Sequence, residues 1–387
     1  MIKIFHTADL HLDSPFSSLP PSLSEQRRGE LRQIFLDMMK YAADNGADLV
    51  LIPGDLFDSA YVSRDTADLL HRGFSSVGCP VVICPGNHDP FTPDSIYAHG
   101  NFPDNVYIFN DETPSCFDFP ALGVSVWGAA FVRPLMENTP LVRIPRLDPN
   151  RINILCQHGD TRNLLSKKCP INVRDIAYRG FTYAALGHIH MADEPALVES
   201  STVAYSGCPV GRSFDEPGWG GALMVTVGDD RTVKWEKLRF ATKRYMVEKL
   251  DVSGVADYND AATRIKALIS DHSYDAETSL RVVLEGEIAP HVSLPLTTLT
   301  RLCQGELAHL ELRDRTIPVF DTAYLEADMT LRGAFYRELL PLLAEGTPRE
   351  RQVAAEALRA GLAAIDNRAI FSDTVPESTD GEEGDAQ

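Results

Sequence analysis

Five short segments of the sequence contain nearly all the side chains that could bind metal ions together. They are Asp9-Leu10-His11, Gly54-Asp55, Gly86-Asn87-His88-Asp89, His158-Gly159 and Gly187-His188-Ile189-His190. Seven of their side chains make a ligand set of two carboxylates, one amide oxygen and four imidazoles, without sulfur, which favours manganese, iron or zinc over magnesium or calcium. Seven ligands are too many for one tetrahedral ion and suit two ions that keep positions open for water.

The charge of such a centre indicates its substrate. Two divalent cations and two carboxylates leave two positive charges, and a hydroxide would leave one. A pocket with this charge attracts a phosphate ester, and two cations at one site can both activate water and stabilise the leaving oxygen. We therefore expect hydrolysis of a phosphoester.

Each of the five segments directly follows residues typical of a strand. Residues 49–52, 81–83 and 152–155 are apolar, as in buried central strands. Loops at strand ends are where a rigid sheet can direct several side chains to one point. Taken singly, each pattern has a structural explanation, such as a turn beside a surface histidine or exposed histidines on a strand. All five patterns in order, each after an apolar strand, favour a shared metal site over these separate structural explanations.

The first 240 residues alternate strands with amphipathic stretches. Strands are expected at 2–8, 48–53, 80–84, 106–110, 123–131, 151–157, 182–186, 202–205, 222–227 and 232–238. Helices are expected at 24–45, where apolar residues recur at helical spacing before Gly46, and at 63–76. This order predicts an α/β fold of two packed sheets with helices outside.

The pattern changes near Lys243. Strand-like segments at 245–252, 279–285 and 307–313 and a helical segment at 259–269 predict a small α+β domain. Helices are expected at 330–345 and 348–365, the second opened by a capping box of Thr347 and Glu350. They either pack on their own domain or form a docking surface for a partner chain. We expect domains at 1–240, 241–325 and 326–372, and a disordered acidic tail at 373–387.

Composition and charge limit the class of protein. The chain has 387 residues, 44% of them hydrophobic and 24% charged, and a net charge of −19. No stretch is apolar enough to span a bilayer and the N-terminal residues do not resemble a signal peptide, so we expect a cytoplasmic protein. Seven scattered cysteines without a CxxC pair exclude a disulfide framework and a thiolate zinc site. The negative charge argues against a protein that coats nucleic acid by bulk electrostatics.

The order of the five segments resembles that of the calcineurin-like metallophosphoesterases. Within that superfamily, His-Thr-Ala-Asp-Leu-His-Leu at 6–12 and Pro-Gly-Asn-His-Asp-Pro at 85–90 resemble the SbcD-type DNA repair exonucleases. Asp-Leu-His-Leu-Asp-Ser-Pro-Phe at 9–16, and Tyr205-Ser206-Gly207 followed by Gly211-Arg212, resemble their YhaO-like branch. The resemblance covers residues 2–240 and implies a four-layer α/β/β/α metallophosphoesterase sandwich, with a small α+β capping domain and C-terminal helices after it.

The resemblance also implies a role for each candidate residue. A first metal ion would be held by Asp9, His11, Asp55 and His190, and a second by Asp55, Asn87, His158 and His188. His88 would stand beside the scissile phosphate as general acid or charge stabiliser, with Asp89 orienting its ring. Tyr205 and Arg212 would contact phosphate or base. The cofactors would be two divalent metal ions, foremost Mn2+, with Fe or Zn as alternatives. One departure is Gln157-His158-Gly159, where many relatives have His-Gln-Gly.

These ligands do not choose among phosphoester substrates. Residues 131–180 hold nine basic and four acidic residues around His158, an excess that could hold DNA phosphates near the metal ions. Relatives of this type work with an SbcC-like coiled-coil ATPase that docks on C-terminal helices, the place of 330–345 and 348–365 here. The resemblance therefore implies a manganese-dependent DNA nuclease subunit for DNA repair, cutting phosphodiesters from ends or in single strands.

Two other functions are compatible with the sequence. A phosphomonoesterase or small-nucleotide phosphodiesterase would use the same ligands, and the acidic charge and lack of a long basic arm favour it. A non-catalytic regulatory subunit of an ATPase complex would keep the metal ions as structural ions, but such a site has no need of the non-ligand His88. The sequence leaves open whether two copies of the chain form a homodimer.

Overall fold

The computed structural model describes all residues except 17–20, 60–61, 149, 290–291, 320–321 and 366–387. The chain divides into two compact units. The first comprises residues 1–247, 274–281 and 306–309, and the second 248–273, 282–305 and the residues from 310 onward. The domain limits expected at 240, 325 and 372 stay predictions, and the expected tail at 373–387 lies outside the described residues. Every helix in the described part of the chain is too short or too polar to cross a membrane.

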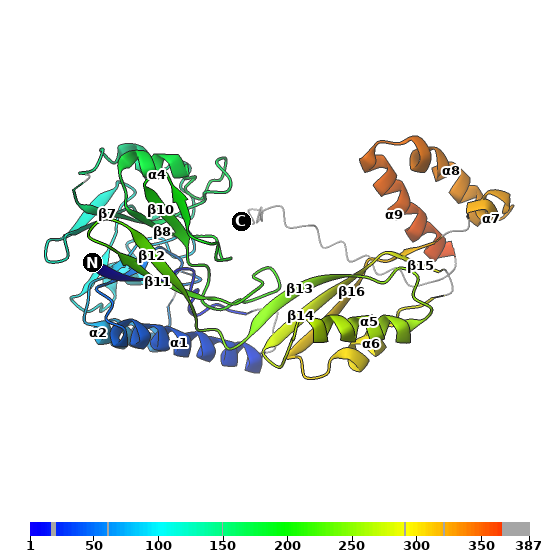
Figure 1. The fold of residues 1–387 in the computed structure, drawn as a ribbon, viewed down its shortest axis with the longest axis horizontal. Coiled ribbons are helices and arrows are strands. Elements are labelled where there is room, and N and C mark those ends of the chain that lie inside the picture. Colours follow the sequence, from blue (N-terminus) through cyan, green and yellow to red (C-terminus); the bar gives the residue numbers. More distant parts are fainter. Residues whose placement is uncertain (17–20, 60–61, 149, 290–291, 320–321, 366–387) are drawn as a thin grey trace. The chain divides into compact units, whose positions relative to one another are not determined.

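The first unit contains two six-stranded sheets. The first has the order β12-β11-β1-β2-β3-β4 and the second β5-β6-β7-β8-β10-β9 (Figure 1). The strands of the first sheet are β1 (Ile2–His6), β2 (Leu49–Ile52), β3 (Val81–Ile83), β4 (Val106–Ile108), β11 (Gly221–Val227) and β12 (Val233–Arg239). Those of the second are β5 (Ser115–Phe119), β6 (Val124–Gly128), β7 (Ile152–His158), β8 (Tyr183–Gly187), β9 (Ala196–Val198) and β10 (Ser201–Tyr205).

Parallel pairing brings the strand ends that precede the five segments together. β1, β2, β3 and β4 run parallel in the first sheet, and β6, β7, β8 and β10 run parallel in the second. His6 at the end of β1 pairs with Leu51, and His158 at the end of β7 pairs with Gly187. The segments that follow therefore all begin at the C-terminal ends of the parallel strands of each sheet.

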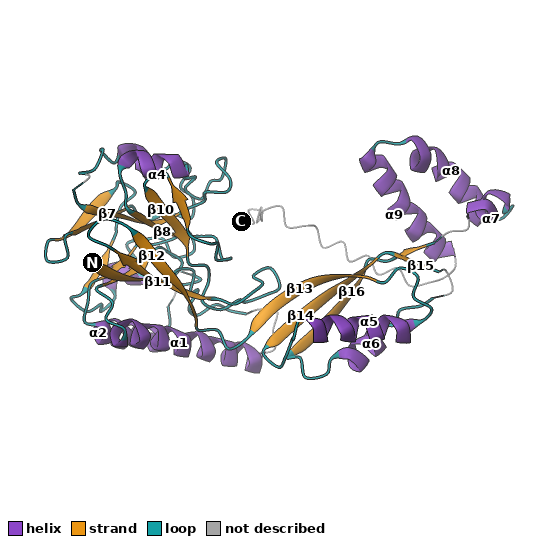
Figure 2. Cartoon of the chain, viewed as in Figure 1, coloured by secondary structure: helices purple, strands orange, loops and turns teal. Residues whose placement is uncertain are grey.

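The side chains of each strand alternate between a core shared by the two sheets and a core on the outer face of its own sheet, because successive residues of a strand point to opposite faces. One core lies between the sheets and includes Ile4, Leu49, Leu51, Val82, Val126, Ile154, Cys156 and Ala185. The opposite face of the first sheet, with Phe5 and Val50, packs on α1 (Pro21–Asp44) and α2 (Arg64–Val77). The outer face of the second, with Leu155 and Ala184, packs on α4 (Val173–Arg179) and the 3-10 helix η1 (Pro140–Arg143). These layers confirm the expected α/β/β/α sandwich (Figure 2).

The remaining strands and helices include those expected after residue 243. β13 (Arg244–Asp251), β14 (Thr278–Glu285) and β16 (His309–Asp314) form a three-stranded sheet, and α5 (Tyr258–Asp271) and α6 (Leu296–Cys303) accompany it in the chain. β15 (Glu287–Ile288) pairs with β17 (Ile317–Pro318). α7 (Thr322–Ala327), α8 (Leu331–Glu345) and α9 (Pro348–Ile365) follow, with Leu325, Tyr336, Leu358 and Leu362 in a common core. The capping box is confirmed, since Thr347 and Glu350 exchange backbone-to-side-chain hydrogen bonds of 2.8 and 3.3 Å.

Candidate metal centre

Backbone hydrogen bonds join four of the five segments in two pairs. Asp9 N–H donates to the Gly54 carbonyl at 3.1 Å, His11 N–H to the Asp55 carbonyl at 3.0 Å, and Gly159 N–H to the Gly187 carbonyl at 3.1 Å. Asp9, His11, Asp55 and His188 have φ values of 53°, 47°, 50° and 103°. Non-glycine residues rarely adopt such values, and where they do so together the strain commonly serves a site.

Two glycines permit this close approach. A Cβ on Gly54, whose φ is +92°, would lie 2.3 Å from His158 Nδ1. A Cβ on Gly86 would lie 2.2 Å from Asp55 Oδ1. Any side chain at these positions would displace a candidate ligand, which explains why glycine precedes Asp55 and Asn87.

The residues predicted for the first metal ion form one cluster. Ligand atoms of Asp9, His11, Asp55 and His190 all lie within 4.8 Å of one another. His11 Nε2 is 3.2 Å from His190 Nε2 and 3.7 Å from Asp55 Oδ2. Asp9 is buried, and its carboxylate accepts the His188 N–H at 3.0 Å.

Of the residues predicted for the second metal ion, Asn87 and His158 also lie near Asp55. His158 Nε2 is 3.1 Å from Asn87 Oδ1 and 3.5 Å from Asp55 Oδ2. The His188 ring crosses the His158 ring at a centroid distance of 5.2 Å. The first predicted set is thus brought together, and of the second set Asn87 and His158 lie near Asp55, with the His188 ring beside that of His158.

Hydrogen bonds fix which ring nitrogen faces the cluster. Nδ1 donates to Asp58 Oδ1 in His11 (2.8 Å), to Glu216 Oε1 in His190 (2.7 Å) and to the Pro53 carbonyl in His158 (3.0 Å). Burial lowers the pKa of His11 to about 4, and burial, with repulsion from His158, lowers the pKa of His188 to about 4. These two rings are therefore neutral at pH 7. In His11 and His158 the Nε2 lone pair is left toward the cluster.

Two features show that this cluster fits cations. Asp55 Oδ2 is buried and accepts no hydrogen bond from the described residues, although a buried carboxylate oxygen normally has a partner. The Nε2 atoms of His11 and His190, both with their Nδ1 directed at a carboxylate, face each other at 3.2 Å. A cation beside Asp55 Oδ2 would satisfy the orphaned oxygen and replace the contact between the two Nε2 atoms. Divalent metal ions suit this mixed donor set.

His88 and Asp89 differ in their positions. The His88 side chain is 46% exposed, and its Nδ1 lies 3.9 Å from Asp58 Oδ1. Asp89 is buried, and its carboxylate is engaged elsewhere: its Oδ1 accepts Gly86 N–H and Asp55 N–H, and its Oδ2 accepts Phe57 N–H and the Tyr97 hydroxyl. The structure therefore places Asp58, and not Asp89, beside the His88 ring. Asp89 organises the backbone of the loops.

The predicted substrate-binding residues are engaged by the protein itself. Tyr205 is buried, and its hydroxyl donates to the Gly159 carbonyl at 2.8 Å and accepts Thr161 N–H at 3.0 Å. Arg212 donates to Asp58 at 3.2 Å and to Glu216 at 2.7 Å. Sequence reasoning missed Asp58 and Glu216. Asp58 follows Asp55 by three residues, which is a usable signal, whereas nothing in the local sequence marks Glu216.

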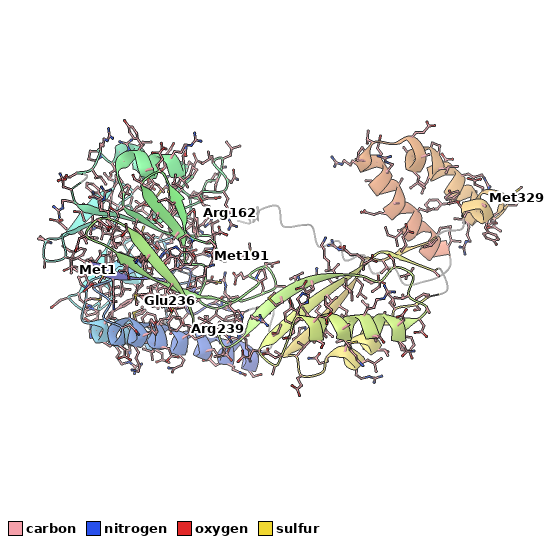
Figure 3. The ribbon with its side chains drawn as sticks, in the orientation of Figure 1. Met1, Arg162, Met191, Glu236, Arg239 and Met329 are labelled. Atoms are coloured by element: carbon pink, nitrogen blue, oxygen red, sulfur yellow. The ribbon has the colours of Figure 1, made fainter. Side chains whose placement is uncertain are left out.

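An ion pair joins the loops that follow His158 and His190. Arg162 lies four residues after His158, and its Nη2 is 2.6 Å from Asp193 Oδ2, three residues after His190. Arg162 and Met191 lie on the same side of the first unit (Figure 3). The loops after β7 and β8 are thus held together where they leave the cluster.

The chain is similar to known proteins. The sequence profile of the Metallophos family, calcineurin-like phosphoesterase, matches residues 2–196. Uncharacterized metallophosphoesterase YhaO of Bacillus subtilis (strain 168) is 31% identical over 257 residues, covering 61% of this chain and 62% of that protein. The crystal structure of TT1561 of Thermus thermophilus has a TM-score of 0.38 and 15% identity, covering 62% of this chain and 99% of that one. Since the family profile spans all five ligand segments, the chain belongs to the calcineurin-like metallophosphoesterases.

Proposed function

We propose that this phosphoesterase is a DNA nuclease that hydrolyses phosphodiesters with two divalent cations, foremost Mn2+, at the cluster around Asp55. The observation that carries the proposal is the orphaned Asp55 Oδ2, 3.7 Å from His11 Nε2 and 3.5 Å from His158 Nε2. One carboxylate oxygen between two imidazoles suits a ligand shared by two cations. The proposed ligands are the two predicted sets, with Asp55 common to both.

The side chains around the proposed substrate have separate roles in hydrolysis. The two cations, when bound, supply an activated water and neutralise the charge of the phosphate oxygens. The neutral imidazoles of His11 and His188 provide nitrogen lone pairs and add no positive charge of their own. We assign to His88, half-exposed beside His11, the transfer of a proton from its ring to the leaving oxygen. Asp58 Oδ1 lies 3.9 Å from His88 Nδ1.

A basic loop beside the cluster supports DNA as the substrate. Arg162, Lys167 and Lys168 follow His158 within ten residues, and the Arg162 side chain is 43% exposed. Such cations hold backbone phosphates without reading sequence. We assign the phosphate contacts to this loop because it directly follows His158; in the protein itself Arg162 pairs with Asp193 and Lys168 donates to the Pro134 carbonyl.

The C-terminal helices support a partner. Leu331, Leu342 and Val353 on α8 and α9 are 69%, 43% and 58% exposed, although both helices share a core. Exposed apolar residues on a helix pair suit the side of a coiled coil. We propose that α8 and α9 bind an SbcC-like ATPase and that the chain serves as its nuclease subunit in DNA repair.

A small-molecule phosphoesterase is the second candidate, favoured by the net charge of −19. The test incubates the full chain and Mn2+ with end-labelled linear duplex DNA, a chromogenic phosphodiester and a chromogenic phosphomonoester. His88→Asn should keep both metal ions and lose about 100-fold or more in hydrolysis, because general acid catalysis contributes that much. His99→Asn, which removes an exposed imidazole from the end of α3 (Ile96–His99), is the matched control.

Shortened DNA in the wild type and the control, with intact DNA in His88→Asn, supports the nuclease. Turnover of the chromogenic esters with intact DNA, also when an SbcC-like ATPase is added, would favour the small-molecule enzyme. Loss of metal from His88→Asn would contradict the role given to His88.

A further inference from the structure

Arg212 and Glu216 lie behind the metal cluster, in the segment between β10 and β11. Glu216 is 9% exposed, and its Oε1 accepts His190 Nδ1–H at 2.7 Å. The same carboxylate accepts Arg212 Nη2–H and the Arg212 backbone N–H, each at 2.7 Å. Donors from His190 and Arg212 therefore converge on the Glu216 carboxylate.

The Arg212 guanidinium joins two carboxylates. Its Nη1 donates to Asp58 Oδ1 at 3.2 Å, and that oxygen accepts His11 Nδ1–H at 2.8 Å. Its Nη2 and Nε donate to Glu216. One cation thus links the acceptor of His11 to the acceptor of His190, the two imidazoles whose Nε2 atoms are 3.2 Å apart. The planar guanidinium can make both contacts at once, which an ammonium group cannot.

The segment that carries this pair is itself anchored. The Gly211 carbonyl accepts Arg27 Nη2–H at 3.1 Å, and Gly218 N–H donates to the Tyr245 carbonyl at 2.8 Å. Between them, the Phe214 ring meets the Tyr245 ring at a centroid distance of 5.1 Å. The pair is therefore held in place on both sides before any cation binds.

We propose that Arg212 and Glu216 are positioning residues for one of the two cations: they hold the His11 and His190 rings with Nε2 toward it. The proposal rests on the ligand set given under the proposed function. It gives Arg212 the role of supporting the metal ligands and not of contacting a phosphate or a base of the substrate. Carboxylate partners of this kind fix the tautomer and raise the basicity of a metal-binding histidine, and their loss commonly weakens metal affinity or activity 10- to 100-fold.

The test measures Mn2+ binding to the full chain by calorimetry, with thermal melting and hydrolysis of a chromogenic phosphodiester alongside. Glu216→Gln keeps the size of the side chain and removes its charge, and Arg212→Lys keeps a cation that cannot span both carboxylates. Asp215→Asn, an exposed carboxylate beside Glu216, is the matched control. We expect two sites in the wild type and in the control. In both test variants one site should weaken about 10- to 100-fold while the other site keeps its affinity. The melting temperature should fall in Glu216→Gln, because its amide NH2 must face a donor that the carboxylate accepted.

Several results would overturn the proposal. Unchanged Mn2+ affinity with a raised KM in Arg212→Lys would make Arg212 a substrate contact. Loss of both sites in Glu216→Gln would reduce the pair to a structural role. A wild-type chain that binds no Mn2+ would refute the proposed ligand set itself, which distinguishes that failure from the failure of the positioning role alone.

Discussion

Asp89→Asn tests the finding that Asp89 organises loops and does not orient His88. Each carboxylate oxygen of Asp89 accepts two donors, and an asparagine amide must turn its NH2 toward one of these pairs. The pair of Phe57 N–H and Tyr97 hydroxyl is the less costly one, because the hydroxyl can rotate and accept. Phe57 N–H then remains buried without an acceptor.

The magnitude follows from these contacts. A buried N–H without a partner costs about 1–3 kcal/mol. We therefore expect the free energy of unfolding to fall by about 1–3 kcal/mol. Metal affinity should change little, because the amide oxygen still accepts Asp55 N–H and Gly86 N–H in place of Asp89 Oδ1.

Urea unfolding followed by tryptophan fluorescence measures the effect in the right part of the chain, since Trp127, Trp219 and Trp235 all belong to the first unit. Asp94→Asn, an exposed aspartate in the following loop, is the control and should leave stability unchanged. Wild-type stability and metal content in Asp89→Asn, combined with lost hydrolysis, would refute the reasoning and indicate that Asp89 orients the His88 ring.

Three further changes have defined outcomes. Asp55→Asn should lose bound metal and hydrolysis together, measured by elemental analysis and turnover; full metal occupancy would contradict its shared position. Tyr205→Phe should lower the free energy of unfolding by about 1–3 kcal/mol in the urea assay, because Thr161 N–H loses its acceptor, and an unchanged midpoint would count against this. His6, bonded to Tyr183, has its pKa lowered to about 3 by burial, so below pH 6.5 only the unfolded chain gains a proton there. The free energy of unfolding should therefore fall by about 2 kcal/mol from pH 7 to pH 5 through His6, and His6→Gln should lack this part of the slope.

The sequence by itself determined the sandwich and the set of candidate ligands. An apolar strand followed at once by Asp, Asn or His is visible in a short stretch of sequence. The strand pattern and the candidate ligand are neighbours in the chain, so both can be predicted without knowledge of the fold. The period of apolar residues likewise predicted the long helix now seen at Pro21–Asp44. The short helix Val173–Arg179 was not predicted, because seven residues are too few to show helical spacing.

Only the tertiary structure decided which residues support those ligands. Glu216 follows His190 by 26 residues and Asp58 follows His11 by 47, so no local spacing connects either carboxylate to its imidazole. Asp89 adjoins His88 in the chain, yet its side chain turns into the buried loops while His88 stays half-exposed. Hydrogen-bond partners depend on where separate strands end in space. That is a property of the packed sheets and not of neighbouring residues.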